Sequence, residues 1–368
     1  MGKSITLTVV ANMTSNYGEG LGNIASVQKV YKNRKVYSIR SRESMKNAIM
    51  VQSGMYDDLQ TDVSGATQKK VNEELNVANC RALEGGYMNT TWSTFIRKSS
   101  FYLTDAISCE SFVNETRFHN NLYLAQNQAA SKGINLQDSS KESGLMPYQY
   151  EYDKALKVYS ITIDLDMIGK DENFKVEADN NEKAHRVNAI LDAIENLTLT
   201  VKGNLDNAEP VFVVGGLSNR KTHYFENVVK VENEKLILSD DLKEKISSEY
   251  SVALLKSNVF NNQAEIIKEL QPKSIVTFFN ELKSEVVYPE SKTFNNTFTP
   301  KETSATIELD KALSGRDLVD GEFSFELYEG SNKLQSTTNK NGKVTFDSIS
   351  YNEVGEHTYT IKEVKGDN

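Results

Sequence analysis

Cysteine is scarce in this sequence, and the cysteines present are poorly placed for a disulfide or a metal site. Two occur among the 368 residues, Cys80 and Cys109, and they form no CxxC pair. Such usage is typical of a reducing compartment, and it argues against a disulfide framework or a zinc knuckle. Histidine is also rare, and its four occurrences include no HExxH motif. We therefore expect no metal and no other cofactor.

Long hydrophobic runs are missing as well. The opening residues, MGKSITLTVVANM, contain one short apolar stretch without the hydrophobic core and cleavage site of a signal peptide. No run in the sequence is long enough to cross a membrane. These absences predict a cytoplasmic protein without a membrane partner.

Sequence motifs for catalysis are absent too. No GxSxG occurs, and neither cysteine has a recognisable catalytic context. Gly18, Gly20 and Gly22 lie close together, but their spacing fits neither GxxxxGKS/T nor GxGxxG. A flexible surface loop is the better interpretation of these glycines. We expect no enzymatic activity.

Acidic residues outnumber basic ones overall, but not everywhere. The formal net charge of −9 argues against nucleic-acid binding, because phosphate contacts need lysine and arginine. From Lys301 onward, 8 basic and 13 acidic residues give −5, over half of the excess. Between Lys29 and Lys46, seven basic residues face only Glu43. We call these seven the basic band: Lys29, Lys32, Arg34, Lys35, Arg40, Arg42 and Lys46. The band is either a nucleic-acid-binding surface or an ordinary solvated face, and composition leaves both interpretations open.

Apolar periodicity predicts strands and helices in irregular order. Alternation predicts strands over residues 5–12, 36–40 and 159–165, the last of them half-buried. Ser41 can cap a helix, and apolar residues over 184–197 predict another, followed by strands at 197–201 and 211–214. Pro272 is expected to open a last helix. This mixture fits an α+β domain better than a regular βαβ array.

The composition changes after Tyr288. Residues 289–303 are polar with two prolines and are predicted to form a linker. Beyond them, four strand-like runs alternate with the turns GSNKL and NKNGK: TIEL, EFSFELYE, KVTFDSI and HTYTIKEV. We therefore predict one domain over residues 1–288 and a small all-β domain over residues 304–368.

Six segments between residues 1 and 290 carry a more specific signal. They are SITLTVVANM, SNYGEGLGNIASVQKV, VYSIRSRESMKNAIM, RKSSFYLTDAIS, PYQYEYDKALKVYSITIDLDMIG and PVFVVGGLSNRKTHYF. In order and spacing they resemble the DevR branch of the Cas-seven family, the CRISPR backbone subunit of type I-B Cascade. The resemblance implies an RRM-like palm with inserted finger and thumb elements.

The same resemblance implies a structural role in antiviral defence. Copies of the protein would stack along a CRISPR guide RNA (crRNA) within a ribonucleoprotein complex that contains other Cascade subunits. Each copy would bind guide phosphates and leave the bases to pair with target DNA, so that sequence is read by the RNA.

Carried over by position, the resemblance also implies individual RNA-binding residues. The first choices are Asn16, Asn23, Lys29, Arg40, Arg42 and Lys46, and the second choices are Arg97, Lys98, Arg117, His119, Arg220 and Lys221. Any of them can instead be ordinary surface charge. Type III relatives cut RNA with an aspartate in the loop after the first strand. Residues 14–23 contain Glu19 and no aspartate, which favours a non-cleaving subunit.

The tail resembles another family through LDKALSGRDLVDGEFSFELYEG, NKNGKVTFDSISY and GEHTYTIKE. These segments are similar to the streptococcal pilin isopeptide-linkage domain, an immunoglobulin-like β domain, over about residues 291–368. The resemblance implies that Lys311 bonds to an asparagine with help from a buried acid, Glu363. TFNNTF at 293–298 resembles the end strand of such a domain, which makes Asn296 the candidate partner. A permuted or strand-swapped domain and an inert remnant both remain open.

A cell-surface pilin or adhesin is the alternative function. The lack of a signal peptide and of a sorting signal argues against it. A metabolic enzyme with an appended β domain is a third class, and no motif supports it.

Overall fold

The chain forms two units, Met1–Ser291 and Lys292–Asn368, each with its own hydrophobic core. The computed structural model describes residues 3–18, 24–91, 93–136, 144–247, 249–288 and 301–364. No helix in these ranges is both long and apolar enough to cross a membrane. Asn23, Glu19, Asn296 and most of the expected linker, including the candidate end strand 293–298, lie outside the described residues.

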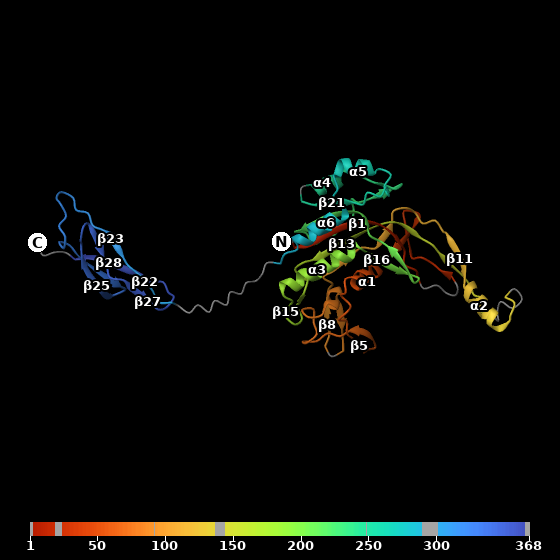
Figure 1. Ribbon diagram of the computed structural model, residues 1–368, viewed down its shortest axis with the longest axis horizontal. Coiled ribbons are helices and arrows are strands. Elements are labelled where there is room, and N and C mark those ends of the chain that lie inside the picture. The colour runs from red at the N-terminus through yellow and green to blue at the C-terminus, as the bar shows by residue number, and fades with distance from the viewer. Residues whose placement is uncertain are drawn as a thin grey trace. The chain divides into compact units, whose positions relative to one another are not determined.

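An antiparallel sheet of eight strands forms the centre of the first unit (Figure 1). The strand order is β21-β18-β1-β13-β10-β4-β3, and β9 also pairs with β13. β1 pairs along its full length with β13 on one side, and from Ser4 to Ala11 with β18 on the other. The strands are β1 (Ser4–Thr14), β3 (Lys29–Lys32), β4 (Lys35–Arg40), β9 (Phe101–Leu103), β10 (Ala106–Ser108), β13 (Lys154–Asp164), β18 (Pro210–Ser218) and β21 (Ser251–Leu254).

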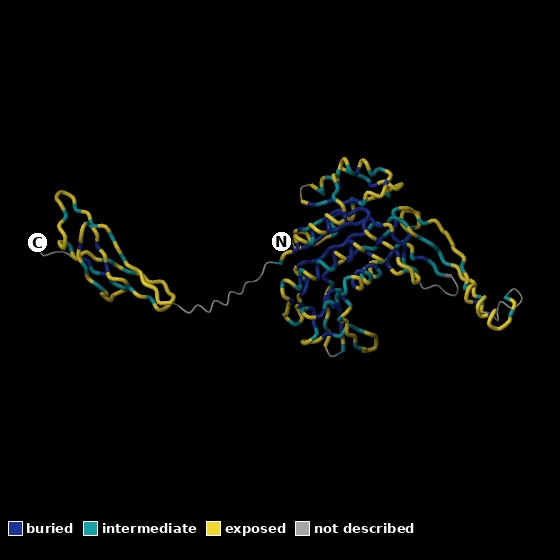
Figure 2. The backbone as a smooth tube through the Cα atoms, in the orientation of Figure 1, coloured by how far each residue is buried: buried dark blue, intermediate teal, exposed yellow. Residues whose placement is uncertain are grey.

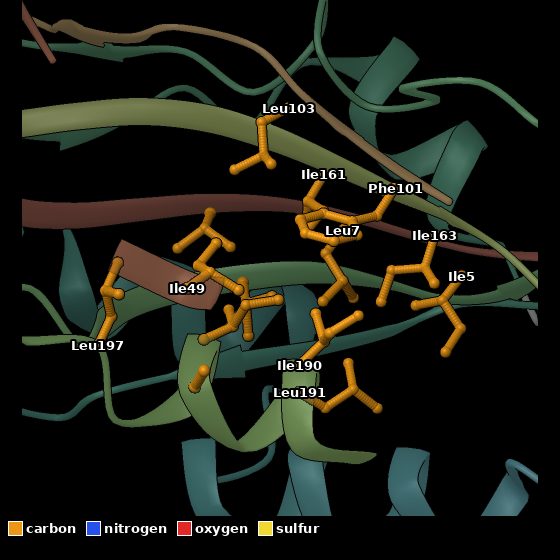
Figure 3. Close-up of a cluster of buried hydrophobic side chains, with 14 of the residues drawn as sticks. Ile5, Leu7, Ile49, Phe101, Leu103, Ile161, Ile163, Ile190, Leu191 and Leu197 are labelled. Atoms are coloured by element: carbon orange, nitrogen blue, oxygen red, sulfur yellow. The ribbon is translucent and has the colours of Figure 1, made fainter. Parts of the chain in front are cut away.

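Three helices cover one face of this sheet: α1 (Arg42–Gln52), α3 (Asn180–Glu195) and α6 (Ile275–Glu285). Alternate residues of β1, such as Ile5 and Leu7, pack with Ile49 of α1 and Ile190 of α3 (Figure 3). Ser41 caps α1, because its hydroxyl accepts a hydrogen bond from the Ser44 amide at 3.2 Å. The predicted helices at this face and the cap at Ser41 are confirmed.

The opposite face carries a second core, with α4 (Asp240–Ile246) and α5 (Gln263–Leu270). Phe212 and Val214 of β18 point to this side and pack with Phe225 and Ile266. Both faces of the central strands are therefore buried, as Figure 2 shows. The first unit has a mixed α/β fold, as the α+β prediction stated.

The prediction that residues 159–165 form a half-buried strand is wrong in its burial. β13 is buried on both sides from Tyr159 to Asp164. Its polar residues face a covering segment instead of water: the Ser160 and Thr8 hydroxyls are 2.7 Å apart, and Thr162 Oγ1 lies 2.9 Å from His223 Nδ1. Hydrogen bonding explains why hydroxyl side chains are tolerated in this interior position.

Gly215 of β18 is required by the close approach of β1. A Cβ at this position would lie 1.9 Å from the Thr6 carbonyl oxygen, and φ is +150°. No other residue type fits this crossing without moving a strand.

Two insertions extend from the sheet. The first follows α1 and contains the 3-10 helix η1 and two hairpins. The second is an arm between β10 and β13 that projects beyond the sheet (Figure 1). In the first insertion lie β5 (Thr61–Ser64), β6 (Ala66–Lys69), η1 (Arg81–Gly85), β7 (Tyr87–Asn89) and β8 (Phe95–Arg97). In the arm lie β11 (Thr116–Asn120), α2 (Leu122–Lys132) and β12 (Pro147–Glu151), with β2 (Ile24–Ala25) paired to β12.

Short two-stranded ladders complete the unit. They are β14 (Lys170–Asp171) with β15 (Val176–Glu177), β16 (Thr198–Val201) with β17 (Asn204–Asn207), and β19 (Val231–Glu232) with β20 (Lys235–Leu236). The expected strands at 197–201 and 211–214 are confirmed by β16 and β18. The expected start of the last helix at Pro272 is wrong, because the Ser274 hydroxyl caps α6 and Lys273 bridges to Ala253.

The second unit is rich in β structure. Its core contains Phe325, Leu327, Val344 and Phe346. The strands are β22 (Thr303–Ala305), β23 (Glu308–Asp310), β24 (Ser324–Glu329), β25 (Asn332–Thr338), β26 (Lys343–Thr345), β27 (Ile349–Tyr351) and β28 (Tyr359–Val364). The sequence prediction missed β25: the turn is confined to Gly330 and Ser331, and the rest of GSNKL belongs to the strand.

Candidate nucleic-acid interface

Buried cations hold the end of β1, where the first loop begins. The Arg40 guanidinium donates from Nε to the Thr14 carbonyl at 3.0 Å and from Nη2 to the Ser15 carbonyl at 3.4 Å. Lys157 Nζ donates to the preceding carbonyl, that of Met13, at 3.0 Å. Three successive carbonyls are thus bonded by two buried cations. The start of the loop is fixed by these bonds.

Carboxylates complete this network. Asp206 of β17 accepts hydrogen bonds from the Thr14 amide and hydroxyl, and it pairs with Lys154 at 2.7 Å. Asp153 accepts from Ser15 Oγ at 2.6 Å and from Lys157 Nζ at 2.7 Å. Burial lowers the pKa of Arg40 to about 10, so its guanidinium remains charged at neutral pH.

Asn16 connects the loop to α1. Its side-chain oxygen accepts a hydrogen bond from the Ser41 amide at 2.8 Å, and its carbonyl accepts one from Gln28. The loop therefore leaves the sheet next to the helix start, where main-chain amides suit an anion.

Two residues of the basic band point inward. Arg40 also donates to Ser44 Oγ at 2.9 Å, so all three of its nitrogens are bonded within the protein. Lys46 donates to the Gly85 carbonyl and to Ser99 Oγ, each at 2.7 Å. Burial lowers the pKa of Lys46 to about 8, and Lys69 nearby acts in the same direction. The two cations join segments of the fold.

Two more residues of the band form ion pairs at the surface. Lys29 lies 2.5 Å from Glu151 of the arm, and Arg42 lies 3.0 Å from its neighbour Glu43. The Arg42 side chain is 63% exposed, and its own amide donates to Asp105 at 2.8 Å. A pair this exposed contributes little stability and leaves the guanidinium accessible to phosphate.

The other three residues lie on the β3–β4 hairpin, and all are exposed: Lys32, Arg34 and Lys35. None of them forms an ion pair with a residue that the structure describes. Asn33 and Arg34 form the two-residue turn with φ of 50° and 62°. Glycine usually takes the second position of such a turn, so an arginine there costs conformational energy.

The hairpin borders a cleft that is also lined by the first residue of α1. Its cavity volume is about 1160 Å³, and its lining includes four cations and four carboxylates: Lys32, Lys35, Arg42, Lys230, Asp105, Glu110, Glu226 and Glu232. Ile107 and Val158 lie on its floor. The charges of the lining are balanced, so a polyanion would be contacted by the exposed cations of the hairpin beside the cleft and not by the cleft as a whole.

The second-choice residues are dispersed over the fold. Arg97 is buried and donates to the Met167 and Lys170 carbonyls and to Ser100. Lys221 pairs with Asp164 and Asp166, and Arg220 with Glu249. Lys98 is exposed and has no ion pair among the described residues. Arg117 and His119 share the β11 strand of the arm.

The arm also carries aromatic residues that the sequence analysis did not select: Tyr148, Tyr150 and Tyr152 in YQYEYD. Their period-two spacing puts them on one face of a strand, and this signal is visible in the sequence. Two distant residues, Tyr17 and Lys202, join them in space: Lys202 Nζ lies 4.6 Å from the centre of the Tyr17 ring and 4.9 Å from that of Tyr150. Burial raises the pKa of Tyr17 to about 12, so its neutral hydroxyl donates to the Glu151 carbonyl at 2.9 Å.

In the tail, Lys311 and Glu363 meet as the resemblance implies. Lys311 Nζ lies 2.9 Å from both carboxylate oxygens of Glu363 and 4.2 Å from the centre of the Phe323 ring. The Glu363 side chain is 42% exposed, however, so the burial expected for this acid is absent.

The first unit has the fold of a CRISPR surveillance-complex subunit. It is similar to a chain of a "CRISPR RNA-guided surveillance complex, pre-nicking", with a TM-score of 0.51 and 9% identity over 77% of this chain and 100% of that chain. A "CRISPR RNA-guided surveillance complex" chain is similar with a TM-score of 0.47 and 12% identity, over 76% of this chain and 98% of that one. No curated protein matches the sequence.

Residues 5–237 match the family described as "CRISPR-associated negative auto-regulator DevR/Csa2". The chain belongs to this CRISPR-associated family, and the resemblance seen in the sequence is confirmed. Residues 307–368 match the "Spy0128-like isopeptide containing domain". The second resemblance is thereby confirmed over most of the tail.

Proposed function

We propose that this protein is a non-catalytic backbone subunit of a cytoplasmic type I-B Cascade complex. It binds guide RNA along the phosphate backbone, stacks with copies of itself and other Cascade subunits, and presents the guide to target DNA. The RRM-like palm with finger and thumb corresponds in this proposal to the central sheet, the insertion after α1 and the arm. One observation carries the proposal: the exposed cations of the basic band lie beside one cleft, and most of them are unpaired among the described residues.

The candidate residues divide into two roles in this proposal. Lys29, Arg42, Lys98, Arg117 and His119 contact RNA, together with Lys32, Arg34 and Lys35 of the hairpin. Arg40, Lys46 and Arg97 position the contacting segments, because their donors are already bonded to protein oxygens. Asn16 holds the loop against the helix start. Arg220 and Lys221 form local ion pairs, so they are the candidates least expected to contact RNA.

The salt dependence of RNA binding tests this proposal. We expect short RNAs of uniform length to copurify with the protein from its native cells. In purified protein, Arg34→Gly and Arg42→Gln should each weaken binding of unrelated guide sequences equally. Each should also reduce the slope of log K against log salt by about 0.7, the value for a lost contact to a single strand.

The Arg34→Gly variant separates binding from folding. Glycine relieves the positive φ of Arg34, so the fold should be at least as stable while the cation is lost. Lys268→Gln on α5 is the matched control, since that lysine is 83% exposed and is absent from the lining of the cleft. Unchanged affinity and slope for both test variants would contradict the proposed RNA contacts.

A further inference from the structure

One face of the β11–β12 ribbon is built from rings and cations. Arg117 pairs with Tyr150 and His119 with Tyr148 across the antiparallel ladder. Because side chains alternate along a strand and directly opposed residues share a face, these four lie on the same side of the ribbon. Tyr152 follows one step further, with its amide bonded to the Glu115 carbonyl.

The rings form a continuous stack. His119 lies between Tyr150, at a centroid distance of 4.7 Å and an interplanar angle of 22°, and Tyr148, at 5.7 Å and 20°. Tyr17 closes the inner end, edge-on to Tyr150 at 6.2 Å. Tyr148 forms the outer end and is 39% exposed. The stack therefore ends in a ring that has a stacked neighbour on one face.

Cations flank this stack. The Arg117 guanidinium lies 3.6 Å from the centre of the Tyr152 ring, and Lys202 lies over both Tyr17 and Tyr150. Lys202 forms no ion pair among the residues that the structure describes. A row of parallel rings next to cations matches a strand whose bases stack and whose phosphates are negative.

We infer that the outer face of Tyr148 binds an unpaired nucleobase of single-stranded RNA by stacking, while Arg117 and Lys202, towards the inner end of the ring row, attract phosphates further along the strand. The inference rests on the proposed function and adds a base contact to its phosphate contacts. A stacked ring selects no particular base, because every base has a π face. The site therefore suits a subunit that must accept any guide.

The test uses the full protein and guide RNA scanned with the fluorescent base 2-aminopurine. We expect one or more positions to be quenched in the complex with the wild type. Tyr148→Leu should remove that quenching and weaken binding by about 5- to 150-fold, the range for one stacked base. The salt slope should not change, because no charge is lost. Tyr148→Phe keeps the ring and should behave as the wild type.

An abasic nucleotide at the quenched position gives the decisive comparison. With it, the wild type and Tyr148→Leu should bind equally, because the ring then has no base to stack on. Tyr123→Leu is the matched control, since Tyr123 is 75% exposed on α2 of the same arm. Tyr148→Leu binding as tightly as wild type, or a deficit that persists on abasic RNA, would overturn the inference.

Two other outcomes have distinct meanings. Failure of the wild type to bind any RNA would refute the proposed function itself. Wild-type RNA binding that Arg34→Gly weakens but Tyr148→Leu does not would leave the proposed function standing and refute the stacking site. Competition by a tyrosine- or proline-rich peptide, with no quenched base, would assign the ribbon to a protein partner and equally refute it.

Discussion

Glu84 is the residue on which the first insertion depends. Its side chain is fully buried on η1, and one oxygen accepts from Arg186 Nη1 at 2.9 Å and from the Gly169 amide at 2.7 Å. The other oxygen accepts from Ser100 Oγ and lies 3.5 Å from Arg97. Segments far apart in sequence, η1, β8, the loop after β13 and α3, thus meet at one carboxylate.

Replacing Glu84 by glutamine should destabilise the first unit by about 3 kcal/mol or more, because Arg97 would keep a buried charge without an ionised partner. The described α-helices all lie in this unit, so far-UV circular dichroism during urea unfolding can measure the change. Glu285→Gln, at an exposed glutamate of α6, should stay within about 0.5 kcal/mol of wild type. Equal urea-unfolding midpoints for the two variants would contradict this role of Glu84.

Residue charges could be counted from the sequence, but their accessibility could not. The basic band stood out as a local excess of charge, and its exposed members border the cleft. No sequence pattern indicated that Arg40 and Lys46 donate to main-chain carbonyls, because those bonds depend on β1 and η1 being brought next to α1. The same holds for Lys202, whose aromatic neighbours belong to segments far away in the chain.

The first loop, residues 14–23, is the element on which the prediction of a non-catalytic subunit rests. It contains Glu19 and lacks an aspartate between residues 14 and 23. With magnesium and a complementary RNA or DNA, we expect the purified protein to protect the paired strand from added nuclease without cutting it. Cleavage that survives further purification and disappears in Glu19→Gln would contradict the non-catalytic assignment. Asp153→Asn would test an acid that the structure describes at the base of the loop.

Elements with one clear periodicity could be predicted, and those covered from both sides could not. The helix at 184–197 and the cap at Ser41 follow from local spacing. β13 alternates aliphatic and hydroxyl residues, which usually indicates a solvated face. In this protein the segment after β18 covers that face with His223 and main-chain carbonyls. No local sequence pattern indicates that such a segment is present.

At the scale of the whole molecule, two units of different character share one chain. The tail carries over half of the net negative charge, so the remaining residues are close to balanced. Its sequence resemblance includes Lys311 and Glu363, which the structure brings into contact. The predicted division of the chain rests on the change of composition after Tyr288.

Intact mass spectrometry tests whether the tail forms an isopeptide bond. The neutral amine of Lys311 would attack the side-chain carbonyl carbon of Asn296, an amide would form, and ammonia would leave with a proton carried by Glu363. Because Asn296 and Lys311 are only fifteen residues apart, we expect the bond to join two chains. Ladders should then persist in denaturing gels, and each bond should lower the summed mass of the joined chains by that of one ammonia.

Lys311→Arg and Asn296→Ala should abolish these ladders and leave RNA binding unchanged. Glu363→Gln should slow their formation, since the proton carrier is lost. An unmodified mass without ladders, on folded and intact protein, would make the tail a plain β module.

The central strand β1 has a further consequence for sequence variation. Its odd positions, such as Ile5, Leu7 and Val9, contact the helical side, while Ser4 and Thr6 donate hydroxyls to the Arg220 and Thr222 carbonyls on the other. Each of these side chains therefore contacts only one of the two layers that cover the sheet. Among homologues, residues 4–9 of β1 should therefore keep aliphatic side chains at the odd positions and small hydroxyl side chains at the even positions, and an insertion of one residue would exchange the two sets.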